Sequence, residues 1–552
     1  MIIRFDRTPE EYHRLSQSAF SRGELDRALL YAEDALRGRS CTEYKVSYAA
    51  ILLAMGRYGE ASDVVLEALC YGTGMRAELY GLMGKISSEL GHFYESLHFW
   101  AKKAHYEGDD DTLTAMDEVM EEIDAEREAR REERDFFIVG KEEKREDPEN
   151  LLRANYAFDH GDYAETIRLA AAEPQDSPRY VEAQVLALRS HLRRKEPTEA
   201  ERVGEEILRV DPHNAYAIYI MIDRFNRREY APLLSDLKEV ECDIYYAVLA
   251  ADSLWDRELA DHFVERLMRA NPYVPGAYFV AAAVALNFKD REKSERYLSD
   301  LSALYRKYPR EVLLRGWRRL KHCRVGFSGK MPPEVAHILE NYVTRHARNA
   351  RDFTTSMLTD AAFRSSVLFL MEDVGRKINT RIISYLEEVD NRQVDAFFSK
   401  ALIRYDMDLL LKRDIFATLY YRKDKGLLYL TQTVVPIRVS CRKPQGYADY
   451  PTALRQAYCE IFAFLTCMTD ASCEERLRTL ADRIALREDA EDLSTEVICG
   501  AILYRMLAEG AIPVNAQVDG TEDACRFILE FVFGFRRYKF SKVLLLAASI
   551  KH

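Results

Sequence analysis

Gly-Glu-Leu-Asp-Arg-Ala, at residues 23–28, is the first of three closely related segments in this chain. The second is Gly-Arg-Tyr-Gly-Glu-Ala at 56–61, and the third is Gly-His-Phe-Tyr-Glu-Ser at 91–96. The leading glycines are 33 and 35 residues apart, and a small residue follows each of them five positions later. A turn glycine and a small residue that recur together at this interval predict one structural unit repeated three times.

The unit resembles the tetratricopeptide repeat, a pair of antiparallel helices of about 34 residues with the pattern W-x2-L-G-x2-Y, then A-x3-F, then P. With Gly91 at the turn, Tyr80 takes the aromatic position and Met83-Gly84 the Leu-Gly position, while Ser96 and Trp100 take the A-x3-F positions. Small residues are needed there because the two helices cross closely. The corresponding residues of the first two units are Tyr12, Leu15-Ser16, Ala28, Ala32, Tyr48-Ala49, Ala61 and Val65.

Further units follow with weaker agreement. Gly161-Asp-Tyr163 predicts a fourth turn, with Ala157 and Ala170 at its small-residue sites. We expect roughly eight helix pairs over residues 9–310. An unrelated helical bundle would also show alanine and leucine at helical spacing, but it has no reason to repeat a turn glycine with a small residue. Prolines stand where the second helices of later units should stop, at Pro212, Pro272 and Pro309.

The predicted order has four segments. Residues 1–116 hold the first three repeats and residues 148–310 hold repeats four to eight. Between them, 117–147 is a charged helical linker, whose Glu and Arg residues support a solvated helix but bury little. A docking site for a basic partner is the alternative reading of this charge run.

Residues 311–552 read as a separate, mainly helical domain of no family that we recognise. A turn at 423–426 precedes two segments rich in β-branched and apolar residues, which predict a small β-hairpin near 427–441. The expected fold class is therefore mainly all-α: a tetratricopeptide-like helical solenoid followed by a mainly helical C-terminal domain with one hairpin.

Composition narrows the function classes. The 552 residues are 48% hydrophobic and 31% charged, and a net charge of -12 argues against general binding to nucleic acid or anionic membrane. Charged residues near the start, among them Arg4 and Asp6, interrupt any secretory signal, and no apolar run approaches the ~20 residues of a membrane span. The ten cysteines form no C-x-x-C pair. We expect a cytoplasmic protein.

Catalytic signatures are missing from the sequence. It contains no H-E-x-x-H, G-x-S-x-G or Walker motif, and Gly72-Thr-Gly74-Met-Arg-Ala77 follows a predicted helix, not the strand that a dinucleotide site requires. The spacing of Cys459, Cys467 and Cys473 does not match common zinc patterns. His322-Cys323 and His346 could be a base and nucleophile only if they met in space. We therefore expect no catalytic residues, metal or cofactor, with the C-terminal domain as the open question.

The resemblance implies a right-handed superhelix whose concave groove receives a protein or peptide segment, and hence a scaffold or adaptor. The lysine-and-asparagine set with which some members grip a terminal carboxylate is not present at the matching sites, which disfavours a chaperone-tail receptor. The residues that the repeat register places in the groove are Gln17, Phe20, Lys85, Asn155, Phe158, Arg189 and Arg193.

A basic stretch carries the alternative function. From Arg315 to Arg351 the chain has nine positive and two negative residues. An acidic protein segment, RNA or the chain's own acidic linker could bind there, which would make the protein a repeat-controlled regulator. A merely solvated face is the other reading. The positive residues are Arg315, Arg318, Arg319, Lys321, Arg324, Lys330, Arg345, Arg348 and Arg351.

Overall fold

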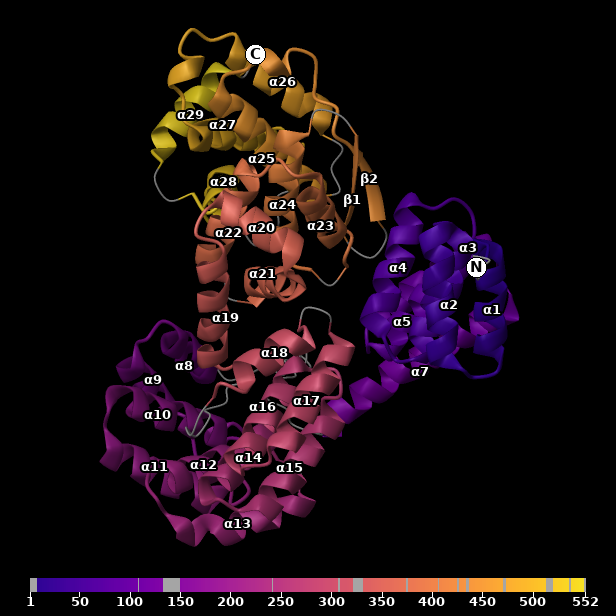
Figure 1. The fold of residues 1–552 in the computed structure, drawn as a ribbon. Helices are drawn as coiled ribbons and strands as arrows, with labels where there is room; N and C mark the ends of the chain where they lie inside the picture. The colour runs from indigo at the N-terminus through magenta and orange to yellow at the C-terminus, as the bar shows by residue number, and fades with distance from the viewer. Residues whose placement is uncertain are drawn as a thin grey trace. The chain divides into compact units, whose positions relative to one another are not determined.

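The structure of the protein is a computed structural model in which helices dominate. Its described part contains 29 α-helices and one two-stranded antiparallel sheet (Figure 1). The expected fold class, mainly α with a repeated helix pair and one hairpin, is confirmed. The described residues are 7–107, 109–132, 149–240, 242–305, 308–320, 331–373, 376–405, 407–423, 426–432, 436–469, 473–512, 520–535 and 538–550.

The chain divides into two compact units. Unit 1 comprises Met1–Met116, Tyr305–Val312 and Ala336–His552, and unit 2 comprises Asp117–Leu304 and Leu313–Val335. Each unit is built mainly from helices that contact their neighbours in the chain.

Unit 1 opens with three antiparallel helix pairs. The first helix begins at a capping box, in which the Thr8 side chain accepts from the Glu11 amide and the Glu11 carboxylate accepts from the Thr8 amide. The helices are α1 (Pro9–Ser21), α2 (Leu25–Gly38), α3 (Thr42–Ala54), α4 (Tyr58–Tyr71), α5 (Arg76–Glu89) and α6 (Phe93–Tyr106), followed by α7 (Asp110–Glu132), which continues into unit 2.

Unit 2 continues the pattern of paired helices, and its helices follow a curved path (Figure 1). Pro212 and Pro272 each stand two positions after the last residue of a second helix, as expected. Pro309 differs, because it stands five positions after the helix that ends at Leu304 and directly before the next helix. Its helices are α8 (Glu149–Asp159), α9 (Tyr163–Ala171), α10 (Tyr180–Arg194), α11 (Pro197–Val210), α12 (Ala215–Asp223), the short α13 (Ala231–Asp236), α14 (Ile244–Leu254), α15 (Arg257–Ala270), α16 (Pro275–Asn287) and α17 (Arg291–Leu304).

The turn inside each pair has a left-handed residue. In the first four pairs it is glycine, with φ between 69° and 78°. The later pairs keep this conformation without glycine, at φ between 55° and 63°. A left-handed backbone is strained for residues with a side chain, so the surrounding packing must hold it. The eight positions are Gly23, Gly56, Gly91, Gly161, Lys195, Asn226, Trp255 and Lys289.

Two residues twelve positions apart form the closest crossing within a pair. The Ser16 hydroxyl donates to the Ala28 carbonyl oxygen at 2.8 Å, and the Ser96 hydroxyl donates to the Gly84 carbonyl oxygen at 2.7 Å. The same contact joins Ser294 to the carbonyl oxygen of the residue twelve positions earlier, at 2.6 Å. A side-chain donor reaches the backbone of the facing helix only where both residues are small.

The fourth pair has a threonine at the crossing position. There Thr166 donates to the carbonyl oxygens of Ala154, at 3.5 Å, and of Asp162 in its own helix, at 2.9 Å. Ala157 and Ala170 are buried, as expected of small-residue sites, but they do not form the twelve-residue pair. The turn glycine, Gly161, stands five residues before Thr166, which is the spacing found in the first three units.

The C-terminal part of unit 1 is helical apart from the hairpin. Its elements are α20 (Ala350–Thr359), α21 (Ala361–Asp373), α22 (Arg376–Glu388), α23 (Arg392–Leu402), α24 (Leu409–Arg422), β1 (Leu427–Thr431), β2 (Pro436–Ser440), α25 (Thr452–Met468), α26 (Glu474–Ala485), α27 (Thr495–Ala508), α28 (Thr521–Phe527) and α29 (Phe540–Ser549). Two further helices, α18 (Arg310–Trp317) and α19 (Pro333–His346), each cross a unit boundary.

Buried charges fix the hairpin and its neighbours to α24. Lys412 is fully buried and donates to both the carbonyl oxygen and the hydroxyl of Thr431, each at 2.7 Å. The next residue, Arg413, lies 4.8 Å from the Phe533 ring and 3.2 Å from a Glu460 carboxylate oxygen. Buried charges are tolerated only when they are paired and hydrogen-bonded, so this arrangement specifies how the segments pack.

Gly84 gives a direct test of the crossing. A Cβ atom on Gly84 would lie 2.6 Å from the buried Trp100 ring. We expect Gly84→Ala to lower the free energy of unfolding, because overpacking costs about 1–3 kcal/mol and outweighs the roughly 1 kcal/mol by which alanine favours a helix over glycine. Urea denaturation measures the difference.

Gly81→Ala, in the same helix, is the matched control. Its Cβ would meet mainly the flexible Lys103 side chain, at 3.3 Å. The control should therefore be neutral or stabilising. Equal effects of the two substitutions would contradict the proposed close crossing at Gly84.

Candidate functional site

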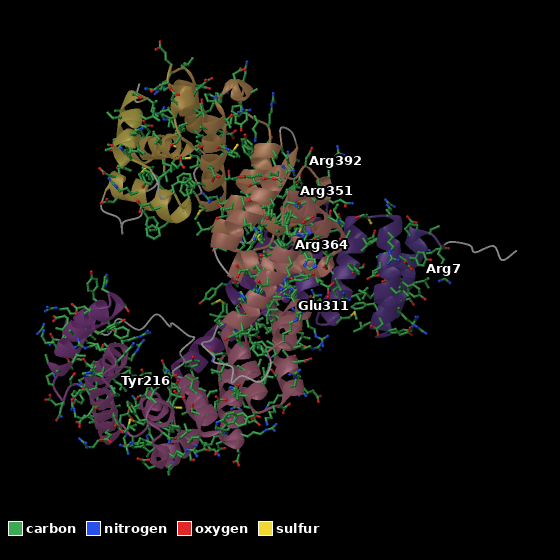
Figure 2. The ribbon with its side chains drawn as sticks, turned by 60° about the vertical axis from the view of Figure 1, so that its left-hand side comes forward. Arg7, Tyr216, Glu311, Arg351, Arg364 and Arg392 are labelled. Atoms are coloured by element: carbon green, nitrogen blue, oxygen red, sulfur yellow. The ribbon has the colours of Figure 1, made fainter. Side chains whose placement is uncertain are left out.

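The first helices of four successive pairs in unit 2 bring aromatic rings and an arginine together. We call this set the aromatic–arginine strip. Tyr216, labelled in Figure 2, lies on the inner side of the curve that these helices follow. The strip consists of Phe158 of α8, Arg189 of α10, Tyr216 and Tyr219 of α12, and Tyr246 of α14.

Arg189 links the two ends of the strip. Its guanidinium lies 4.7 Å from the centre of the Phe158 ring, a cation–π distance. Burial raises the pKa of Tyr216 and Tyr246, the latter to about 12, and the positive charge of Arg189 opposes this rise at both. Arg189 therefore lies close enough to both phenols to interact electrostatically with them.

The tyrosines pack ring against ring. The ring centres of Tyr216 and Tyr246 are 4.7 Å apart in an edge-to-face arrangement, and those of Tyr219 and Tyr246 are 6.0 Å apart and stacked. Tyr245, which is buried, adds a further edge-to-face contact to Tyr246 at 5.2 Å. Such contacts hold the half-buried rings in place, so little side-chain entropy remains to be lost on binding.

Local sequence sets the position of the α12 rings. Asn214 caps α12, and its side-chain oxygen accepts from the Ala217 amide at 3.0 Å. Tyr216 and Tyr219 are three residues apart and share one face of the helix, while Ala217, Ile218 and Met221 are buried in the core of unit 2. The cap therefore determines which residues of α12 reach the strip.

The structure brings some of the expected groove residues together. Phe158 and Arg189 are in direct contact, and Arg193 lies one helical turn beyond Arg189 and is exposed. Asn155 is exposed, but its amide donates to the Leu151 carbonyl oxygen of its own helix at 3.1 Å.

The remaining expected residues lie elsewhere. Gln17 and Phe20 are exposed on α1, and Lys85 is exposed on α5, so all three belong to the helix pairs of unit 1. Sequence reasoning missed Tyr216, Tyr219 and Tyr246. The signal that could have found them is the three-residue spacing of Tyr216 and Tyr219, which places both rings on one face of a helix. Their segment lacks a turn glycine that would have fixed the repeat register.

The basic stretch does not form one surface within a unit. Arg315, Arg318 and Arg319 belong to unit 2, whereas Arg345, Arg348 and Arg351 belong to unit 1. Arg318 makes a two-point ion pair with Glu295, at 2.6 and 2.9 Å. Lys321, Arg324 and Lys330 lie outside the described residues, as do His322 and Cys323.

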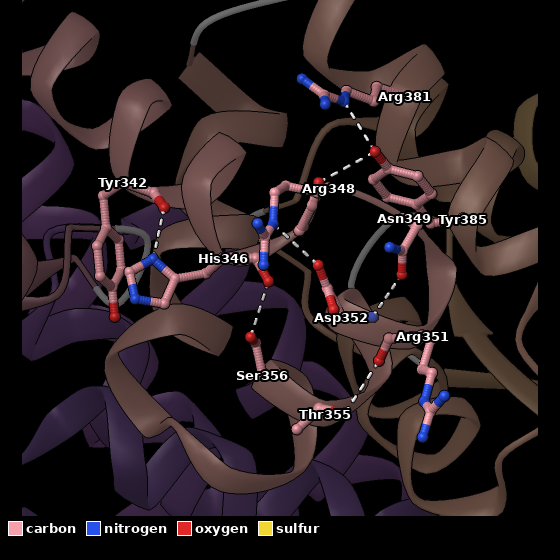
Figure 3. A network of polar contacts seen from close by, with 11 residues as sticks. Tyr342, His346, Arg348, Asn349, Arg351, Asp352, Thr355, Ser356, Arg381 and Tyr385 are labelled. Carbon is pink, nitrogen blue, oxygen red and sulfur yellow. Dashed lines mark hydrogen bonds and ion pairs between the residues drawn. The ribbon is translucent and has the colours of Figure 1, made fainter.

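Local polar contacts hold the unit 1 part of this stretch. Figure 3 shows Arg348 paired with Asp352, at 3.1 Å, and Arg381 donating to the Tyr385 hydroxyl, at 3.0 Å. The ring of His346 contacts the Tyr342 carbonyl oxygen of its own helix at 2.8 Å. These contacts stabilise helix ends and bring no described nucleophile to His346.

Cys459 and Cys467 have the properties of core thiols, whereas Cys473 is only partly buried. Burial raises the pKa of Cys459 to about 11 and that of Cys467 to about 12, so both remain protonated and unreactive at neutral pH. In the part of the chain that the structure describes, no three His, Cys, Asp or Glu side chains gather as a metal site would require.

One cavity, of about 640 Å³, lies beside the hairpin. Lys443 lines it, and its ammonium lies 3.1 Å from the centre of the Tyr420 ring, which holds this charge in place. Its lining residues are Gly426, Arg442, Lys443, Pro444, Gly446, Tyr447 and Ala448.

Comparison with known proteins gives remote matches only. No family model and no curated protein matches the chain. Among solved structures, yeast Tom70 is 11% identical, covering 98% of this chain and 95% of its own, with a TM-score of 0.19. The TPR domain of P58(IPK) is 14% identical over 65% of this chain and 96% of its own, with a TM-score of 0.21.

A third structure, the complex of the TPR2AB domain of yeast Sti1 with pHSP90, is 14% identical over 52% of this chain and 98% of its own, at a TM-score of 0.21. These neighbours include TPR domains. Because the TM-scores are low, the assignment of a tetratricopeptide-like fold rests on the helix pairs, their turns and their crossings. No helix within the described ranges is both long enough and apolar enough to cross a membrane.

The raised pKa of Tyr246 predicts a pH dependence of stability. Between about pH 10 and pH 12 the unfolded chain loses the Tyr246 proton and the folded chain keeps it, so stability should fall as pH rises, by up to ~1.4 kcal/mol per pH unit for this group. Tyr246→Phe removes this contribution. Urea denaturation across this range should show a shallower decline for the variant.

Tyr156→Phe, at an exposed tyrosine of α8, is the control and should leave the decline unchanged. If Tyr246→Phe and the unsubstituted protein lost stability at the same rate with pH, the Tyr246 phenol would not be shielded as described.

Proposed function

We propose that this chain is a protein-interaction scaffold and that the aromatic–arginine strip is where it receives a segment of a partner protein. One observation carries the proposal: four consecutive first helices of unit 2 contribute aromatic and arginine side chains that contact one another in two groups. The charge of Arg189, in the first group, acts on Tyr216 and Tyr246 in the second. A segment laid along these helices can contact several of them at once. Affinity and specificity then come from a few aromatic and arginine contacts.

The energetics of the strip suit binding. Trp, Tyr and Arg are enriched among the residues that dominate the energetics of protein interfaces. Aromatic rings offer large contact areas with few rotatable bonds. Here the rings are already half-buried against the core of unit 2, so a partner meets a preformed surface. The expected cost of ordering the strip is correspondingly small.

A binding role suits these groups better than catalysis. The raised pKa values of Tyr216 and Tyr246 keep their phenols protonated at neutral pH. General acid–base catalysis needs a group that titrates near the working pH, and the strip supplies none. We therefore propose a non-enzymatic role that needs no cofactor.

We also propose that the scaffold works in the cytoplasm. None of the nine cysteines among the described residues forms a disulfide, and seven of them are buried. Free buried thiols suit a reducing compartment.

Site-specific photo-crosslinking tests the proposal. A benzophenone amino acid that replaces Tyr216 in the full chain should crosslink to a defined segment of one partner in native cells, identified by mass spectrometry. The same replacement at Tyr156, exposed on α8 and outside the strip, is the matched control. Crosslinks at Tyr156 that equal those at Tyr216, or crosslinks at Tyr216 to many unrelated proteins, would contradict the proposal.

A further inference from the structure

We propose that the partner segment is acidic, with an Asp or Glu side chain that binds Arg189 between two aromatic subsites. This inference rests on the proposed function and names the partner chemistry of the same site. The Phe158 ring forms one subsite, and the Tyr216–Tyr246 pair forms the other. Apolar side chains on either side of the acidic residue would fill them.

The charges on the strip favour an anion at Arg189. Among the residues that the structure describes, neither Arg189 nor Arg193 forms an ion pair with a carboxylate. The neighbouring Arg224 is different, because it lies 3.4 Å from the Asp223 carboxylate. Two arginines one turn apart on α10 therefore present positive charge that no carboxylate of the described residues pairs with.

The geometry of Arg189 suits a carboxylate. The guanidinium of Arg189 lies 4.7 Å from the centre of the Phe158 ring, and the residue is exposed. The N–H groups of a guanidinium match the two oxygens of a carboxylate. Contact with Phe158 also limits the motion of Arg189, which lowers the entropic cost of binding.

The same rings could stack nucleic-acid bases, but the charge pattern disfavours a nucleic acid. A single strand carries a phosphate at every nucleotide and needs positive charge along its whole path. The helices α12 and α14 contain no Lys or Arg. At that end of the strip, the negative charge of Asp243 contributes to the rise in the pKa of Tyr246. The same negative charge would repel a phosphate. An acidic side chain needs positive charge at only one point.

Charge-matched peptides test this inference on the full chain. The probes are short fluorescent peptides of Leu and Tyr with one variable position, which is occupied by Glu, Gln or Lys. An oligouridylate of similar length is the fourth probe. Fluorescence anisotropy gives the Kd of each. We expect the Glu peptide to bind about 10-fold more tightly than the Gln peptide, the effect of one charge-assisted hydrogen-bonded pair, and the Lys peptide to bind most weakly.

Substitution at Arg189 locates the effect. Arg189→Gln should abolish the preference for Glu over Gln, measured as the ratio of the two Kd values within the variant. Arg202→Gln, at an exposed arginine of the second helix α11, is the control and should retain the preference. Circular dichroism confirms that both variants are folded.

Three outcomes would overturn the inference: no binding of the Glu peptide, equal affinities for the Glu and Gln peptides, or a preference that survives Arg189→Gln. Tightest binding of the oligouridylate, lost in Arg189→Gln, would also overturn it and identify a nucleic acid as the occupant. In each of these cases the crosslinking experiment at Tyr216 still decides the scaffold proposal on its own.

Discussion

The close crossing of the two helices in a pair is the constraint on which the fold depends. Ser16 with Ala28 and Ser96 with Gly84 show the same arrangement, a small residue on one helix in hydrogen-bonding contact with the backbone of the other. The facing sides of the two helices are buried against each other at the crossing. Each pair must therefore bury its remaining apolar surface against the pairs before and after it. The strip consists of side chains on the first helices that this stacking leaves half-exposed.

The sequence allowed the early repeats to be predicted more readily than the later ones. Gly23, Gly56, Gly91 and Gly161 mark their turns because glycine adopts a left-handed backbone without strain. In the later pairs, Lys195 and the equivalent residues hold the same conformation. A side chain makes this conformation unfavourable, so tertiary packing must stabilise it there. Residue type alone could not reveal those turns, although the expected helix-ending prolines helped.

The candidate site could be predicted only in part, again because only the early units have a turn glycine that fixes the register. Phe158 and Arg189 follow from the register, since Gly161 anchors the fourth unit and the fifth comes directly after it. Tyr216, Tyr219 and Tyr246 lie in units where the turn residue is Asn226 or Trp255 and the second helix α13 is short, so the register was lost. In the C-terminal region, burial of Lys412 and Arg413 could not be foreseen, because charged residues are seldom buried.

Hydrogen–deuterium exchange of a crossing variant tests the serial packing most directly. Ala200 is fully buried at the crossing position of α11. In Ala200→Leu, the account predicts faster amide exchange in α10, α11 and α12, with α1 to α6 unchanged, because each pair depends mainly on its neighbours. Exchange that rises equally throughout the chain, or does not rise in α10 to α12, would contradict the account.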